Sequence, residues 1–124
     1  MSDTPPPTGS NPAPSHTHQG VDTTLGGYLS VHNRPPAFHG SDGHPYTVSV
    51  EIEKTPNLQA PFSGYLVFPR WAETGVGIVG HVETPILLEE TSREKAEASL
   101  GSMKLIDAQD LLEEAIRRQD HGIE

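Results

Sequence analysis

Imidazole and carboxylate side chains gather in one part of the sequence. His32, His39, Asp42 and His44 lie close together along the chain. An open zinc or iron site needs about three such ligands, so these four residues are the candidate metal ligands. Their spacings match no known ligand signature, and the Pro and Gly residues between them provide no rigid frame. The alternative interpretation is a loop of solvent-exposed histidines, and we expect no cofactor.

A second group of residues points to binding. Tyr65, Val67 and Trp71 fall on one side of a predicted strand, and Arg70 stands next to Trp71. Tyr, Trp and Arg are the residue types that dominate binding hot spots in protein interfaces. The pattern predicts a partner-binding surface made of these four residues. The alternative is that the first strand, the loop around Phe38 or the N-terminal tail folds over this face.

Motifs for catalysis or for cofactor binding are weak in this sequence. Residues 75–80 match the letters of the dinucleotide fingerprint, but no helix can start at the following His81–Pro85, so we interpret them as a glycine-rich strand. No Gly-x-Ser-x-Gly elbow is present, and the absence of Cys excludes disulfides, thiolate zinc sites and Cys nucleophiles. No catalytic residue is predicted, and we expect a protein that is not an enzyme.

The composition narrows the class of partner. The formal net charge is -9 and Lys and Arg are scattered, which argues against nucleic acid and anionic membranes as ligands. No apolar stretch approaches the roughly 20 residues that span a bilayer. The first residues lack the pattern of a secretory signal, so cytoplasm is the expected location. A basic protein would be attracted to such a surface.

The chain is predicted to contain one folded domain. Residues 1–24 are rich in Pro, Ser, Thr and Gly, and Val21 is almost the only sizeable apolar side chain among them. Such a segment cannot bury enough surface to offset its ordering entropy, so we expect a disordered tail. Residues 25–124 then form a single domain, since about 100 residues suffice for one core.

Hydrophobic periodicity predicts strands first and helices last. We expect a short strand at 28–32, a loop at 33–43, and a half-buried strand in which Tyr46, Val48, Val50 and Ile52 alternate with polar residues. The strand at 62–71 has apolar residues on both faces and should be central. A hairpin connection at 72–75, a strand at 76–83 and a short edge strand at 86–88 follow.

Two C-terminal helices complete the predicted fold. Thr91 and Glu94 have capping-box spacing before a helix that ends at Gly101, and a second helix starts after Asp107 as N-cap. Its apolar stripe should pack on the sheet and give an α+β domain, an antiparallel meander of four to five strands with helices on one face. The stripe consists of Ala108, Leu111, Leu112, Ala115 and Ile116, and its expected contacts are Val48, Val50, Leu66, Ile78 and Val82.

Three functions remain open from the sequence. The first is a non-enzymatic interaction module, such as an accessory subunit, adaptor or acidic inhibitor, which binds another protein, a basic one included, or a second copy of itself. The second is a small metal-binding or metal-dependent domain that uses the loop histidines. The third is a small-molecule binding module with residues 33–46 as a lid.

Overall fold

The computed structural model describes residues 22–122, with side chains as far as residue 120. Residues 1–21 of the predicted tail therefore lie outside the described residues. Thr23 and Thr24 already belong to the folded part, because Leu105 donates its N–H to the Thr23 carbonyl at 2.8 Å and Thr24 forms a β-bridge with Lys104. The contacts of the domain thus begin slightly before the predicted boundary.

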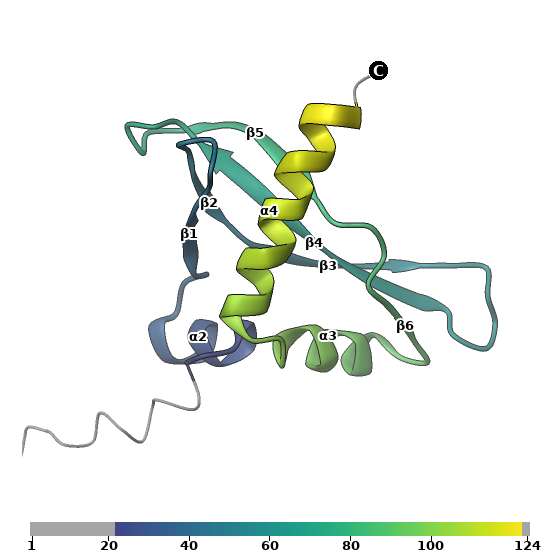
Figure 1. Cartoon of the computed structure of the whole chain (residues 1–124). Helices are drawn as coiled ribbons and strands as arrows, with labels where there is room; N and C mark the ends of the chain where they lie inside the picture. The colour runs from purple at the N-terminus through teal and green to yellow at the C-terminus, as the bar shows by residue number, and fades with distance from the viewer. Residues whose placement is uncertain (1–21, 123–124) are drawn as a thin grey trace, which may run out of the picture.

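The described chain forms an antiparallel sheet with helices packed on one face, as Figure 1 shows. This confirms the predicted α+β class. The sheet has six strands, more than predicted, and the described elements are α2 (Leu25–His32), β1 (Ala37–His39), β2 (Pro45–Thr47), β3 (Ser49–Lys54), β4 (Phe62–Trp71), β5 (Ile78–Glu83), β6 (Leu88–Glu90), α3 (Arg93–Gly101) and α4 (Leu105–Gly122).

Strand β4 is the centre of the sheet, as its apolar residues on both faces predicted. It pairs with β2 and β3 along one edge and with β5 and β6 along the other. Strand β1 pairs with β2. The predicted alternation from Tyr46 to Ile52 is also confirmed, although the strand is divided at Val48. Pro69 lies opposite the end of β2 and has no N–H to donate to it. This missing donor explains why the pairing with β4 is interrupted between β2 and β3.

The β4–β5 connection is a glycine turn that includes residues 75–77, so the predicted glycine-rich strand is confirmed only from Ile78 onward. Gly75 and Gly77 both have positive φ angles, 83° and 86°, which a residue with a side chain rarely adopts. Ala72 donates its N–H to the Gly77 carbonyl and accepts one from Gly75. Strand β5 starts at Ile78, two residues later than predicted, because this turn uses the residues before it.

The predicted strand at 28–32 is wrong, because these residues belong to helix α2. Thr24 caps the helix by accepting the Gly27 N–H at 3.0 Å, and Asn33 ends it in a left-handed conformation. A Cβ at Gly26 would meet the Gly101 carbonyl oxygen at 3.2 Å, so the glycine pair lets α2 and α3 cross closely. The tertiary contact outweighs the poor helix propensity of glycine.

The predicted loop at 33–43 also needs correction, because it contains strand β1. Phe38 of β1 packs edge-on against Phe68 with ring centroids 6.1 Å apart. Phe68 faces the helices and is fully buried. The loop around Phe38 therefore folds over the helix side of the sheet.

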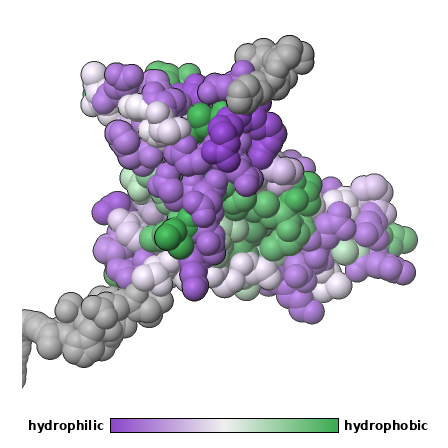
Figure 2. All heavy atoms as spheres, in the orientation of Figure 1, coloured by the Kyte–Doolittle hydropathy of each residue, from purple (hydrophilic) through white to green (hydrophobic). Residues whose placement is uncertain are grey.

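Both C-terminal helices are confirmed, with shifted starts. Ser92, not Thr91, caps α3 by accepting the Lys95 N–H at 3.1 Å, and Asp107 lies in the first turn of α4, not at its cap. The apolar stripe of α4 is buried against Val48, Leu66 and Val82. Figure 2 shows that the outward surface of α4 is hydrophilic, as an amphipathic helix requires.

Ile78 is an exception to the predicted core. Its side chain is 58% exposed, although the alternation of its strand predicted contact with the helices. The pairing of β4 with β5 shifts register between Arg70 and Trp71, just where Ile78 is paired. This irregularity moves Ile78 out of the buried row.

Candidate functional site

The side of the sheet away from the helices carries most of the predicted binding residues. The register places Ser49, Val67 and Glu83 in one row across three strands, and Glu51 opposite Tyr65 in the next row. We call this surface the open face and define it by Glu51, Glu53, Tyr65, Val67, Trp71 and Glu83. Tyr65, Val67 and Trp71 are half-buried, and the helices of the described chain pack on the opposite side.

Hydrogen bonds between neighbouring strands fix the side chains of the open face. The Tyr65 hydroxyl donates to a Glu53 carboxylate oxygen at 2.7 Å, and the Trp71 indole N–H donates to the Thr47 hydroxyl at 3.1 Å. The hydrogen bond to Glu53 raises the pKa of Tyr65 to about 12, with further contributions from the charges of Glu83 and Glu51. Tyr65 therefore stays protonated at neutral pH.

The charge of the open face has one sign. Glu51, Glu53 and Glu83 surround Tyr65 and Val67, and the outward positions of β3, β4 and β5 contain no Lys or Arg. Ser49 donates to Glu51 at 2.7 Å, which orients that carboxylate without neutralising it. The surface combines aromatic and apolar groups with unneutralised carboxylates. Such a surface is chemically complementary to Lys and Arg side chains, which carry aliphatic stems and cationic ends.

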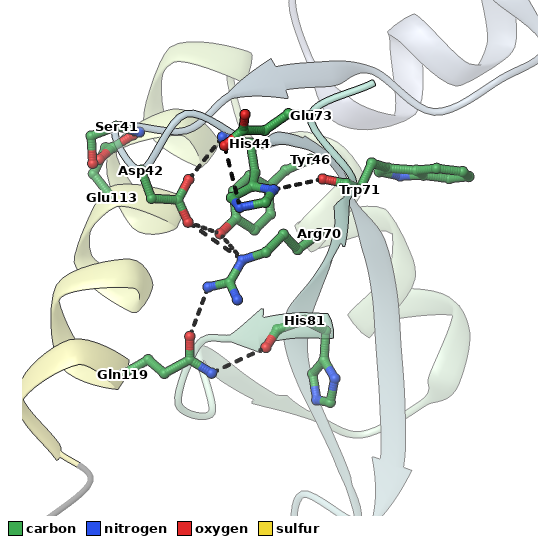
Figure 3. A network of polar contacts seen from close by, with 10 residues as sticks. All are labelled: Ser41, Asp42, His44, Tyr46, Arg70, Trp71, Glu73, His81, Glu113 and Gln119. Atoms are coloured by element: carbon green, nitrogen blue, oxygen red, sulfur yellow. Dashed lines mark hydrogen bonds and ion pairs between the residues drawn. The ribbon is translucent and has the colours of Figure 1, made fainter. Parts of the chain in front are cut away.

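Arg70, the fourth predicted binding residue, lies on the helix side of the sheet, separated from the other three. Figure 3 shows its guanidinium within a polar network while the Trp71 ring points away from it. Arg70 donates from Nε to the Tyr46 hydroxyl at 2.7 Å and from Nη2 to Gln119 of α4 at 2.8 Å. The residue is an anchor between the sheet and α4, and it does not belong to the open face.

Tyr46 is at the centre of this polar network, which we define as Asp42, His44, Tyr46, Arg70 and Gln119. Its hydroxyl donates to an Asp42 oxygen at 2.7 Å, and the same oxygen lies 3.4 Å from Arg70 Nε. Burial and the Asp42 hydrogen bond raise the pKa of Tyr46 to about 12. The Tyr46 hydroxyl both donates and accepts a hydrogen bond, so it ties the turn before β2 to the end of β4.

The charges of the polar network are mutually stabilised. Burial opposes ionisation of Asp42, yet hydrogen bonds from Tyr46 and the His44 N–H, with the charge of Arg70, lower its pKa overall. The pKa of Arg70 is raised, chiefly by its hydrogen bond with Tyr46. His44 Nδ1 lies 2.9 Å from the Trp71 carbonyl, which can only accept, so the ring N–H is on Nδ1. These contacts fasten the turn at 40–44 to β4.

The predicted metal ligands are not brought together. His32 lies on α2, where its Nε2 is 3.3 Å from an Asp22 oxygen, while Asp42 and His44 belong to the polar network. His39 is an exposed residue of β1. Among the residues that the structure describes, no group of three or more His, Asp or Glu side chains could hold a metal ion.

The sequence did not reveal the polar network. Alternation along residues 46–52 correctly turned Tyr46 toward the helices, and a buried Tyr hydroxyl requires a partner. One partner, Asp42, lies in the turn just before β2, and the other, Arg70, lies at the distant end of β4. The only available signal was the inward direction of Tyr46, which indicates that a partner exists without naming it.

An apolar groove lies between α2 and the sheet, and we call it the α2 groove. Its volume is about 510 Å³, within the range of ligand pockets. Its lining consists of Leu25, Gly26, Leu29, Pro35, Pro36, Val48, Ser49, Val50, Glu97 and Gly101. Glu97 is the one charged residue of this lining, and no ion pair with another described residue occupies its carboxylate.

Comparisons with known proteins give no relative for this chain. No protein-family model, no curated protein and no solved structure matches it. None of the helices in residues 22–122 has the length and apolar character needed to cross a membrane. Any functional conclusion therefore depends on the geometry of the surfaces described above.

Proposed function

We propose that this chain is a protein–protein interaction module that binds a basic partner through the open face. The observation that supports the proposal is the arrangement of Tyr65 and Val67 among Glu51, Glu53 and Glu83, on the side of the sheet opposite the helices. Aromatic residues with unneutralised charge around them are typical of interface centres. The net charge of -9 adds long-range attraction for a cationic protein.

A basic partner fits this surface better than a second copy of the chain. A face-to-face homodimer would bring two sets of the same carboxylates together without Lys or Arg between them. Like charges at an interface are costly because they lose water without gaining a counter-charge. Self-association through the open face is therefore an outcome that the experiment must exclude.

Site-specific photo-crosslinking tests the proposal. A photoreactive residue replaces Val67 on the open face, and the matched control replaces Ile106, which is 68% exposed on α4. We expect a basic protein to be captured from cells at position 67 and not at 106. Equal capture at both positions, or capture of a second copy alone, would contradict the proposal.

Calorimetry with the purified partner then tests the chemistry. The double variant Glu51→Gln, Glu83→Gln keeps the shape of the side chains and removes two charges. Its affinity should be lower than that of the unmodified chain at low salt, and this difference should shrink at high salt, where screening weakens the attraction. Tyr65→Ala should weaken binding by about tenfold or more, because truncation of a hot-spot aromatic has this effect. The matched control Glu94→Gln lies on helix α3 and should leave affinity unchanged. Unchanged binding by the charge-neutral variant would exclude the open face as the contact.

Small-molecule binding remains the second candidate function because the α2 groove includes Pro35 and Pro36 of the predicted lid segment. Glu97 is the charged residue in its lining. A thermal-shift screen tests this alternative, since a ligand of the native state raises the midpoint by mass action.

A further inference from the structure

The outer edge of β3 is unpaired within the described chain. Strand β3 pairs with β4 on one side only, and β1 extends the sheet beyond β2 without reaching β3. No side chain of the described residues is hydrogen-bonded to the backbone of Ser49–Lys54. The edge therefore has backbone groups that only solvent or another strand can satisfy.

The ladder reveals which backbone groups point outward. The Leu66 carbonyl accepts the Thr84 N–H and the Gly64 carbonyl accepts the Leu87 N–H, so both residues direct their backbone toward the β5–β6 side. Tyr65 and Val67 must then direct theirs toward Glu51 and Ser49. By the same alternation, the N–H and C=O groups of Val50 and Ile52 point away from β4.

The two sides of this edge differ in chemistry. On the helix side, Val48 and Val50 form one wall of the α2 groove, which is otherwise mostly apolar. On the other side, Glu51 and Glu53 of β3 belong to the open face. Successive side chains of an added strand would point to opposite sides, one to each of these surfaces.

We propose that the β3 edge accepts an extended segment of the basic partner in which Lys or Arg alternates with apolar residues. The inference deepens the proposed function and depends on it, since the partner's cations are those drawn to the open face. Strand addition uses backbone hydrogen bonds for affinity and alternate side chains for specificity. A second copy of β3 is disfavoured, because its own Glu51 and Glu53 would lie beside those of the first.

A synthetic hexapeptide tests the proposal on the whole chain. The probe Lys-Val-Lys-Ile-Lys-Val has the length of the six-residue β3. One control peptide has the same composition in two blocks, Lys-Lys-Lys-Val-Ile-Val, and another replaces each Lys with Glu. NMR measures the affinity of each peptide and the hydrogen exchange of the backbone amides. We expect the alternating basic peptide to bind most tightly and to slow exchange at Val50 and Ile52.

The variant Val50→Pro removes an outward N–H that β4 does not use, so the β3–β4 ladder can persist. We expect this variant to bind the alternating peptide about tenfold more weakly than the unmodified chain does. If the proline disturbs the fold, the hydrogen exchange of Val50 and Ile52 in the unmodified chain still tests the proposal, because that measurement needs no variant. Equal binding of either control peptide, or no binding of the alternating one, would overturn the proposal.

The outcomes separate this proposal from the one on which it rests. Peptide-induced shifts at Tyr65 and Val67 without slower exchange at Val50 and Ile52 would reject strand addition and leave the open face as the binding surface. Absence of a crosslinked partner at position 67 would instead reject the proposed function, whatever the peptide does at the edge.

Discussion

Two tyrosines of this chain make the same kind of hydrogen bond in opposite surroundings. Tyr46 donates to Asp42 inside the domain, and Tyr65 donates to Glu53 on the open face, both at 2.7 Å. Each has its pKa raised to about 12. Because water can replace the partner only at the exposed site, the two bonds differ in what they contribute to stability.

Replacement of each tyrosine by phenylalanine measures that difference. Tyr46→Phe leaves Asp42 and the Nε group of Arg70 without their shared hydroxyl, so we expect a loss of about 1–3 kcal/mol in the free energy of unfolding. Tyr65→Phe is the matched control and should leave the unfolding midpoint almost unchanged. Urea denaturation followed by Trp71 fluorescence gives both values. Equal losses in the two variants would show that burial does not govern these bonds.

The ionisation of Asp42 predicts how stability changes in acid. Its pKa is lower in the folded chain than the value of about 3.9 for an unfolded Asp. The stabilisation is therefore complete above pH 4 and is lost as pH falls through the folded pKa. Asp42→Asn should lower the unfolding free energy at pH 7, and the gap to the unmodified chain should narrow below pH 4. A gap that is constant from pH 7 to pH 2.5 would contradict this linkage.

At the scale of elements, the packing of three neighbours on strand β4 depends on Gly64. A Cβ at Gly64 would meet Leu100 Cδ1 at 2.7 Å, Leu88 Cδ1 at 3.2 Å and Ile52 Cδ1 at 3.3 Å. These side chains come from α3, β6 and β3, so one glycine lets three elements pack on the same point of β4. Interiors packed this closely tolerate an added methyl poorly.

The variant Gly64→Ala should therefore lower the unfolding free energy by about 1–3 kcal/mol. Gly80→Ala on β5 is the matched control, because its Cβ would find only Arg70 Nη1 at 3.6 Å. An alanine that fits without strain reduces the entropy of the unfolded chain, so the control should be neutral or slightly stabilising. Thermal unfolding by circular dichroism compares them. A Gly64→Ala variant as stable as the control would mean that the three neighbours repack freely.

Most elements were predictable because their periodicity reports burial. Alternation identified the β2–β3 segment, apolar residues on both faces identified β4, and the stripe through Leu112 and Ile116 identified α4. Helix α2 was not predictable, because its short sequence fits either period and its two glycines favour neither. The crossing of Gly26 with Gly101 packs this segment as a helix against α3, and that contact joins residues far apart in the sequence.

The candidate site was predictable to a similar degree. The side of β4 that bears Tyr65, Val67 and Trp71 followed from residue parity alone, as did their separation from the helices. Arg70 was misplaced because its proximity to Trp71 in sequence suggested a shared surface, whereas neighbours on a strand point to opposite faces. The α2 groove was beyond sequence reasoning, since it requires α2 to be a helix.

At the scale of the whole molecule, the domain has two dissimilar sides. The helix side contains the apolar core, with Tyr46, Leu66, Phe68, Leu100 and Leu112 fully buried. The other side holds the carboxylates of the open face around a few aromatic and apolar groups. Figure 2 shows that apolar side chains also gather beside α4. Among the large apolar residues outside the core, Ile86 is exposed, while Leu87 and Leu88 pack against the core. Stability comes from the first side, and the proposed binding belongs to the second.

The β-bridge between Thr24 and Lys104 has a consequence for synthesis of the chain. Helix α2 is held at its start by residues that follow α3, since Leu25 donates its N–H to the Met103 carbonyl at 2.9 Å. The ribosome adds residues one by one from the N-terminus. Helix α2 can therefore make these contacts only after the residues that follow α3 have been synthesised. Until then, Leu25 lacks these native contacts in the nascent polypeptide and leaves an apolar side chain accessible to other molecules.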